Sequence, residues 1–266
     1  MINSHFIKQG KQQKRPWQHS GFTLIEMVAV IVILAILATI GTGFVVQTTE
    51  GYQRTQSRAL LANTARQALE RMTRQLRMAL PNSVRVLNGG SCIEFMPIVA
   101  GGNYFNPVAD GTNGVAPTAS IPASLVTVDF GTARHLVIGA NQPTEIYAAV
   151  AAARETYNGY ATNALQIGTA RQWARNSMGK RYYLLDNPLA FCVVNSELRF
   201  YGNLTVTDTP PTGAFDILAR GVTSTTPFSL AAGSENRNTR VDIALGISSS
   251  GETLTYTQGV FIRNVP

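Results

Sequence analysis

The sequence predicts an α+β protein, in which one long N-terminal helix precedes a mainly antiparallel, β-rich globular domain. Two observations carry this prediction. An apolar run followed by an amphipathic stretch fills residues 22–80, and the chain beyond Pro81 alternates β-prone runs with turn-forming residues. The 266 residues suffice for one sizeable domain beyond the helix, so we expect a β-rich domain over residues 81–266.

Residues 1–21 have the character of a leader, because they are polar and basic and directly precede the apolar run. The leader holds four of the 22 basic residues and no acidic one, so the formal charge of +7 falls to +3 without it. The high isoelectric point is therefore poor evidence for nucleic-acid binding. The same charges favour a cytoplasmic leader and a C-terminal domain on the far side of the membrane.

Residues 22–46 are expected to cross a membrane. Glu26 is the single ionisable residue among these 25, and a helix of this length spans about 37 Å, against a hydrocarbon core of roughly 30 Å. No Ala-x-Ala cleavage pattern follows Val46, which favours retention of this helix. A carboxylate at mid-bilayer costs about 2.5–3.5 kcal/mol on insertion scales, so Glu26 is expected to have a partner and a role.

The helix is predicted to continue outside the membrane to Leu80 and to end before Pro81. Apolar residues at three- and four-residue steps form a stripe that indicates the seat of the globular domain. Arginines occupy much of the remaining surface, either as a solvated face or as contacts for acidic partner subunits. The stripe comprises Leu61, Ala65, Ala68, Leu69, Met72, Leu76 and Leu80.

Beyond residue 82 the chain is predicted to be β-structure with loops. Gly89-Gly90 and Asn195-Ser196 indicate hairpin turns. Residues 97–124 are interpreted as a long loop, and a short helix is expected around Ala148–Glu155. The predicted strands are Ser83–Leu87, Cys92–Met96, Leu125–Phe130, Leu136–Gly139, Arg181–Leu185, Leu189–Val194, Glu197–Tyr201, Val241–Ile247 and Thr253–Ile262.

The stretch Gly21-Phe22-Thr23-Leu24-Ile25-Glu26 resembles the class III signal of type IV pilins and type II secretion pseudopilins. The resemblance implies a pilin-like fold and cleavage between Gly21 and Phe22 by a membrane prepilin peptidase. It also implies N-methylation of Phe22 and a role for Glu26 in helix-to-helix assembly. An ordinary signal anchor with a stray glutamate is the alternative.

Segments at residues 64–74, 79–86, 92–97 and 261–266 further resemble minor prepilins of the mannose-sensitive haemagglutinin (MSHA) pilus system. This resemblance implies a minor pilin in the inner membrane of a Gram-negative bacterium. Its C-terminal domain would be periplasmic, or displayed on a pilus at the cell surface. The implied partners are other minor and major pilins and the inner-membrane assembly platform. The alternatives are a type II secretion minor pseudopilin and a tip module that binds DNA or a glycan.

Catalysis is poorly supported, and we expect neither an enzyme nor a bound cofactor. His135 is the one histidine after the leader and is expected at a strand edge, and two cysteines with one histidine do not make a structural zinc site. The turn from Asp110 to Asn113 offers two oxygen side chains to calcium, although a plain turn explains it as well. Trp173, between two arginines, is a candidate for stacking on a sugar or base; core packing is the alternative.

Cys92 and Cys192 are the only cysteines, and both lie in predicted strands. An even count in an exported domain favours a disulfide, and two buried free thiols are the alternative. Such a bond would close a loop of 100 positions and contribute about 2–4 kcal/mol. If the two strands are neighbours, it would tie the first hairpin after the helix to the central sheet.

Overall fold

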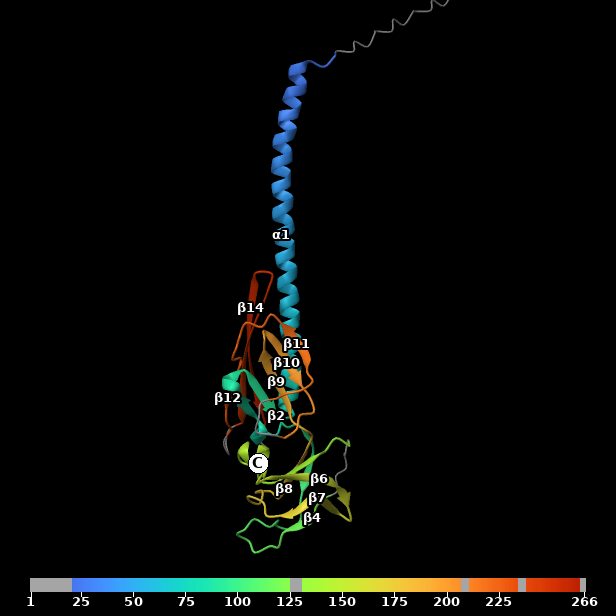
Figure 1. Cartoon of the computed structure of the whole chain (residues 1–266), viewed down its shortest axis with the longest axis vertical. Helices are drawn as coiled ribbons and strands as arrows, with labels where there is room; N and C mark the ends of the chain where they lie inside the picture. Colours follow the sequence, from blue (N-terminus) through green and yellow to red (C-terminus); the bar gives the residue numbers. More distant parts are fainter. Residues whose placement is uncertain (1–20, 125–130, 207–210, 234–237, 264–266) are drawn as a thin grey trace, which may run out of the picture. The chain divides into compact units, whose positions relative to one another are not determined.

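The computed structural model describes residues 21–124, 131–206, 211–233 and 238–263 (Figure 1). The chain divides into two compact units, residues 1–53 and residues 54–266. The first unit contains the whole apolar run, residues 22–46, and the second contains the end of the helix together with the strands that the structure describes. The protein is thus α+β, with a long apolar N-terminal helix followed by antiparallel sheets, as expected of a type IV pilin fold.

Helix α1 (Leu24–Arg77) contains 54 residues and is long and apolar enough to cross a membrane. Its residues from Leu24 to Gln56 are all exposed, including the whole apolar run. A helix that is apolar on every side normally has protein or lipid around it rather than water. Length and composition therefore suit a single-pass membrane anchor.

The helix ends at Arg77 rather than at the predicted Leu80. The N–H of Leu80 donates to the carbonyl of Met96 (3.0 Å), and the N–H of Ile98 donates to the carbonyl of Met78 (2.8 Å). The chain therefore leaves the helix early to pair with residues 96–98. Leu80 is extended (φ −66°, ψ 123°), because the ring of Pro81 disfavours helical geometry in the preceding residue.

Two antiparallel sheets pack on the final part of α1. The first has the order β1-β2-β9-β10-β11 and the second the order β12-β13-β14. Figure 1 shows β9, β10 and β11 beside the end of α1. The strands are β1 (Arg85–Leu87), β2 (Cys92–Phe95), β9 (Leu189–Val194), β10 (Glu197–Tyr201), β11 (Asp216–Arg220), β12 (Phe228–Ala231), β13 (Thr239–Ser249) and β14 (Glu252–Ile262).

Both predicted hairpins are present. β1 pairs with β2 across a 3-10 turn (Asn88–Gly90), in which Gly89 and Gly90 have φ of 64° and 106°. β9 pairs with β10 through Asn195 and Ser196, both of which have positive φ. Asparagine and glycine tolerate this left-handed region best, so the turn residues identified the hairpins correctly.

Six of the seven residues of the predicted apolar stripe belong to the main core, whereas Leu80 lies beyond the end of α1 and belongs to a separate cluster. Ala65, Met72 and Leu76 are fully buried against side chains from both sheets. The sheets contribute Ile93, Phe95, Phe191, Leu198, Val241, Leu245 and Val260 to this core, among others. The stripe is therefore the seat of the globular domain.

A six-stranded sheet is built entirely from the segment between β2 and β9, and it has its own core around Tyr104, Leu136, Tyr182 and Leu184. Its order is β3-β8-β5-β6-β7-β4. The strands are β3 (Ile98–Asn103), β4 (Thr118–Pro122), β5 (His135–Val137), β6 (Arg154–Ala161), β7 (Ala164–Arg171) and β8 (Arg181–Leu185), and the segment also holds helix α2 (Thr144–Tyr147).

This sheet corrects two predictions. Residues 97–124 are not one long loop, because β3 and β4 lie there and pair with β8 and β7. Residues 148–155 are not helical, because β6 begins at Arg154 and only the short α2 precedes it. The glycine-containing strand β3 and the residues from Arg154 onward are strands because partner strands satisfy their backbone groups, an effect that local propensity does not capture. The predicted strand Leu125–Phe130 lies outside the described residues.

Cys92 and Cys192 form the expected disulfide. They are directly opposite each other in the pairing of β2 with β9, with Cα atoms 4.1 Å apart. The N–H of Val193 donates to the carbonyl of Ser91 (2.8 Å), so the neighbouring cysteines form a non-hydrogen-bonded pair, in which side chains approach most closely. The bond therefore ties the first hairpin to the central sheet, at the pair of strands from which residues 96–188 emerge.

We expect Cys192→Ala to lower the free energy of unfolding by about 2–4 kcal/mol, because the unfolded chain loses a cross-link that closes a long loop. Urea unfolding of the full chain in detergent measures the change. Dithiothreitol should lower the midpoint of the wild type toward that of the variant and leave the variant unchanged. Equal midpoints under oxidising conditions would contradict this assignment of stability.

Candidate assembly site

The N-terminus of α1 is built as a helix cap. The N–H of Glu26 lies 3.1 Å from the carbonyl oxygen and 3.4 Å from the side-chain Oγ1 of Thr23, and the N–H of Met27 lies 3.3 Å from the same carbonyl. Thr23 and Glu26 thus occupy the first and last positions of the Thr-x-x-Glu capping pattern. The Thr-x-x-Glu spacing could have predicted this cap from the sequence, whereas the resemblance to pilin signals implied only an assembly role for Glu26.

Glu26 is exposed in the first turn of α1, and its carboxylate makes no hydrogen bond or ion pair with another described residue. Phe22, immediately before the cap, is 75% exposed. A carboxylate near a helix N-terminus is stabilised by the helix dipole. The geometry leaves both side chains available for contacts with other molecules.

Four threonines of α1, two in the apolar run (residues 22–46) and two just after it, donate their hydroxyl groups to carbonyls within the helix. Thr39 and Thr42 donate to carbonyls three residues back, and Thr48 and Thr49 donate to carbonyls four residues back, at 2.8–2.9 Å. A hydroxyl without a partner is costly in hydrocarbon, so this bonding makes the threonines compatible with a bilayer. Glu26 thus remains the distinctive polar group of this segment.

The arginines of α1 fall into two groups. Arg58 pairs with Glu252 (2.7 Å), and Arg71 pairs with Asp216 (3.4 Å), so these two hold the helix to β14 and β11. Arg66, Arg74 and Arg77 are exposed. The arginine-rich surface is therefore partly used for internal ion pairs and partly solvated.

One family model matches the chain, the prokaryotic N-terminal methylation motif, at residues 18–42. The chain carries a prepilin-type N-terminus. The match supports a type IV pilin-like prepilin, processed by a prepilin peptidase and assembled with other pilins, and it suits a structural protein rather than an enzyme. No curated protein and no solved structure matches the chain.

His135 is placed for structure rather than catalysis. His135 is the first residue of β5, as expected of a strand start, but β5 lies between β8 and β6 and is therefore not an edge strand. Its ring nitrogens lie 3.2 Å from the Asn187 side-chain oxygen and 3.4 Å from the Arg154 guanidinium. Burial lowers the pKa of His135, and the charge of Arg154 lowers it further. Neither of these two partners is a nucleophile that the imidazole could activate.

Trp173 belongs to the core of the six-stranded sheet, since only 3% of it is exposed. The Arg171 guanidinium lies 5.1 Å from its ring centre, and Arg175 is directed to Glu145 at 2.7 Å. The indole is therefore not available to stack on a sugar or a base.

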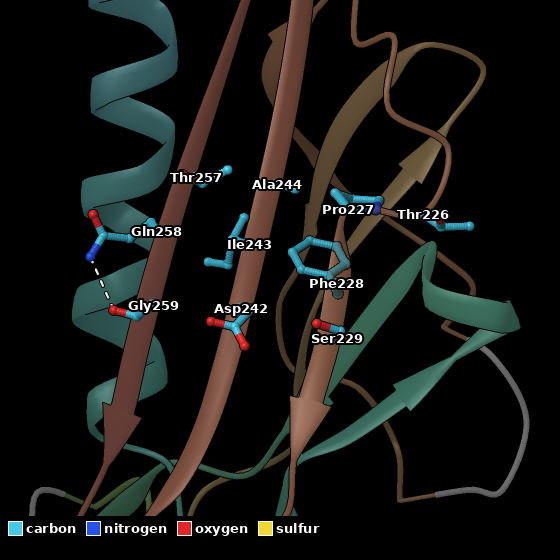
Figure 2. A pocket seen from close by; sticks show the side chains of 10 residues that line it. All are labelled: Thr226, Pro227, Phe228, Ser229, Asp242, Ile243, Ala244, Thr257, Gln258 and Gly259. Carbon is cyan, nitrogen blue, oxygen red and sulfur yellow. Dashed lines mark hydrogen bonds between the residues drawn. The ribbon is translucent and has the colours of Figure 1, made fainter.

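An open hollow of about 400 Å³ lies over β12, β13 and β14 (Figure 2). Among the described residues that line it, Asp242 is the only ionisable one, and its carboxylate pairs with Arg240 at 2.7 Å. The rest of the lining is small, apolar or uncharged, with Thr257, Gln258 and Gly259 from β14. The described lining of the hollow therefore contains no pair of ionisable side chains that could act as acid and base.

In the turn that begins at Asp110, nearby N–H and hydroxyl groups donate hydrogen bonds to the Asp110 carboxylate. Asp110 Oδ1 accepts hydrogen bonds from the N–H and hydroxyl of Thr112 and the N–H of Asn113, at 2.8–3.1 Å. Its Oδ2 accepts from the Asn176 amide at 2.8 Å. These donors, with Asn176 the largest contributor, lower the pKa of Asp110 from 3.8 to about 2. The arrangement is that of an Asx turn, and among the described residues no cluster of three His, Cys, Asp or Glu side chains could hold a metal.

We expect Asp110→Asn to destabilise the protein at neutral pH, with an effect that disappears in acid. Because folding lowers this pKa, the stabilisation is fully present above the unfolded pKa near 4 and is lost as the pH falls toward 2. Thermal midpoints of wild type and variant between pH 7 and pH 2 measure it. Thr112→Val, which removes one donor, should act in the same window but less strongly. A difference that stays constant with pH would contradict the charge-based explanation.

Proposed function

We propose that the protein is a minor pilin of a type IV pilus of the MSHA type, similar to minor prepilin O of that system. The observation that carries the proposal is the prepilin-type N-terminus, in which the methylation motif at residues 18–42 coincides with a capped, exposed and apolar helix. The finer assignment rests on the sequence segments at residues 64–74, 79–86, 92–97 and 261–266.

In this proposal residues 1–21 are a leader removed between Gly21 and Phe22, after which Phe22 is N-methylated. Residues 22–46 anchor the protein once in the inner membrane, and the domain from residue 81 onward is periplasmic before assembly. The basic leader supports this orientation, because basic segments are retained on the cytoplasmic side.

Glu26 is proposed as the charged assembly contact. A carboxylate inside a bundle of apolar helices needs a positive partner, and its own described surroundings supply none. Cleavage creates an amine at Phe22, which lies at nearly the same bilayer depth as Glu26. The partner is therefore the Phe22 amine of a neighbouring subunit.

A low-copy position suits the size of the domain. The six-stranded sheet between β2 and β9 adds bulk with its own core, which a bulk filament subunit does not need. A secretion pseudopilin would use the same N-terminus, so the neighbouring genes discriminate between the two. A pilus cluster supports the proposal, and a secretion cluster contradicts the MSHA assignment.

We expect the mature protein to begin at methylated Phe22 when a prepilin peptidase is present. Intact-mass measurement of membrane-purified protein should give the chain from Phe22 to Pro266 plus one methyl group, less two hydrogens for the disulfide. The same protein from a peptidase-deficient strain is the control and should retain residues 1–21. Retention of the leader in the peptidase-positive strain would refute the class assignment.

We expect Glu26→Ala to be cleaved normally and to fail in assembly, because the neighbouring amine is left unpaired in an apolar surrounding, at a cost of about 3–5 kcal/mol. Pilus number and co-purification of other pilins from detergent extracts measure the effect. Glu70→Ala removes an exposed carboxylate of α1 outside the apolar run and serves as the matched control. Normal piliation by the Glu26 variant would overturn the proposed role.

A further inference from the structure

The strand β14 is a sheet edge with an unusual build. It contains 11 residues and pairs with β13 alone, in a register without a shift from Glu252 to Ile262. At about 3.4 Å per residue the open side extends for roughly 37 Å. An edge of this kind presents a row of backbone donors and acceptors that can pair with another strand.

Hydrogen bonds on the other side of β13 identify the backbone groups at the open edge. Ala244 and Ser248 donate to Pro227 and Gly221, and Gly246 accepts from Thr223, so these residues of β13 face away from β14. In an antiparallel pair, two opposite residues either bond to each other or both direct their N–H and C=O groups away from the shared ladder. Their partners Thr257, Thr253 and Thr255 therefore point away from β13, and the alternation extends to Gly259 and Phe261.

None of the N–H groups of these five residues donates a hydrogen bond within the described part of the chain. The carbonyl of Gly259 accepts only from the Gln258 side chain at 3.0 Å, which Figure 2 shows as a dashed line. The exposed side-chain amide of Gln258 thus bonds to a carbonyl that would otherwise be free to pair with a neighbouring strand. The edge is open and its main-chain groups are available.

The other sheet edges of the described chain are protected. β1 and β12 have three and four residues, respectively. β3 and β4 have shifts in their pairing, and β4 ends in Pro122. β11 pairs with a strand whose register shifts, and it carries Asp216 and Arg220. Short length, bulges, proline and charge all discourage strand addition. β14 has none of these from Thr253 to Ile262.

The side chains of β14 define the strand that it fits. Residues 253–262 carry no charge, and the alternate residues from Thr253 to Phe261 are exposed, with 60% of Phe261 exposed. A charged residue in an incoming strand would lose water without gaining a partner. β-branched and aromatic side chains would instead form favourable cross-strand pairs with the threonines and Phe261.

We infer that the open edge of β14 binds an extended, uncharged and proline-free segment of another pilin-like subunit, which adds to the sheet as a further strand. The inference rests on the proposed function, since it names a contact by which this subunit is recognised. It adds a contact in the globular domain, separate from the contact of Glu26 in the membrane.

Thr257→Pro tests the proposal at the middle of the edge. Proline removes an N–H that faces outward and takes no part in the ladder with β13, so the fold should survive. Thr257→Val keeps the N–H and is the matched control. Each full-length variant is expressed with its gene cluster, and subunits carrying the methylation motif that co-purify in detergent are identified and quantified by mass spectrometry.

We expect Thr257→Pro to reduce co-purification at least about tenfold, because it blocks a backbone pair and leaves the partner's carbonyl unpaired. Thr257→Val should match the wild type. Hydrogen exchange adds a direct readout. The alternate amides from Thr253 to Phe261 should exchange fast in the purified chain and slowly in the co-purified assembly. If the proline variant is unfolded by thermal melting, Thr257→Lys replaces it.

Unchanged co-purification by a folded Thr257→Pro variant, with loss by Glu26→Ala, overturns the strand-addition proposal alone. Unchanged co-purification by both variants instead overturns the proposed function. Slow exchange of the edge amides in the purified chain by itself, with a dimer in solution, assigns the edge to a second copy and also overturns the inference. Fast exchange of the same amides within the co-purified assembly would also overturn the strand-addition inference.

Discussion

Burial of one stripe of α1 is the interaction on which the globular domain depends. Ala65, Met72 and Leu76 are inaccessible to water, and side chains from two separate sheets meet over them. The small side chains of Ala65 and Ala68 belong to the same core cluster as the large rings of Phe95 and Phe191. Since hydrophobic burial scales with the apolar area removed from water, neither sheet retains its core without this stripe.

The charged groups around that core differ in what they contribute. In the pairs of Arg58 with Glu252 and Arg71 with Asp216, one side chain is exposed to solvent, and pairs at the surface contribute about 0–1 kcal/mol. Arg85 and Glu94 are instead nearly buried at 2.8 Å, and the guanidinium lies 3.8 Å from the centre of the Tyr147 ring. This buried pair connects the β1–β2 hairpin with α2, and so fixes how the segment between β2 and β9 leaves the first sheet.

Sequence patterns predicted the features that local chemistry determines. The period of the apolar residues located the helix and its buried stripe, and turn residues such as Asn195 located hairpins. The strands at Arg181–Leu185 and Leu189–Val194 have the predicted bounds. At the candidate site, the motif predicts cleavage after Gly21 and an assembly role for Glu26, and both stay predictions; the Thr-x-x-Glu spacing also fits the cap that Thr23 makes.

The features that could not be predicted depend on distant partners. β3 contains Gly101 and Gly102 and is a strand because β8 pairs with it. A short helix was predicted around Ala148–Glu155, but β6 begins at Arg154 and its pairing with β5 and β7 makes that end of the segment a strand. The end of α1 at Arg77 likewise depends on hydrogen bonds to residues 96–98. The open edge of β14 likewise depends on distant partners, because the hydrogen bonds on the other side of β13 determine which backbone groups of β14 face outward.

The disulfide determines what happens when the backbone is cut within the segment between β2 and β9. Every strand of the six-stranded sheet lies between Cys92 and Cys192, so a protease that cuts the backbone once within that sheet releases no fragment. The two parts of the chain stay covalently joined through the disulfide between Cys92 and Cys192. A single cut among the strands of the six-stranded sheet would therefore leave the subunit in one piece.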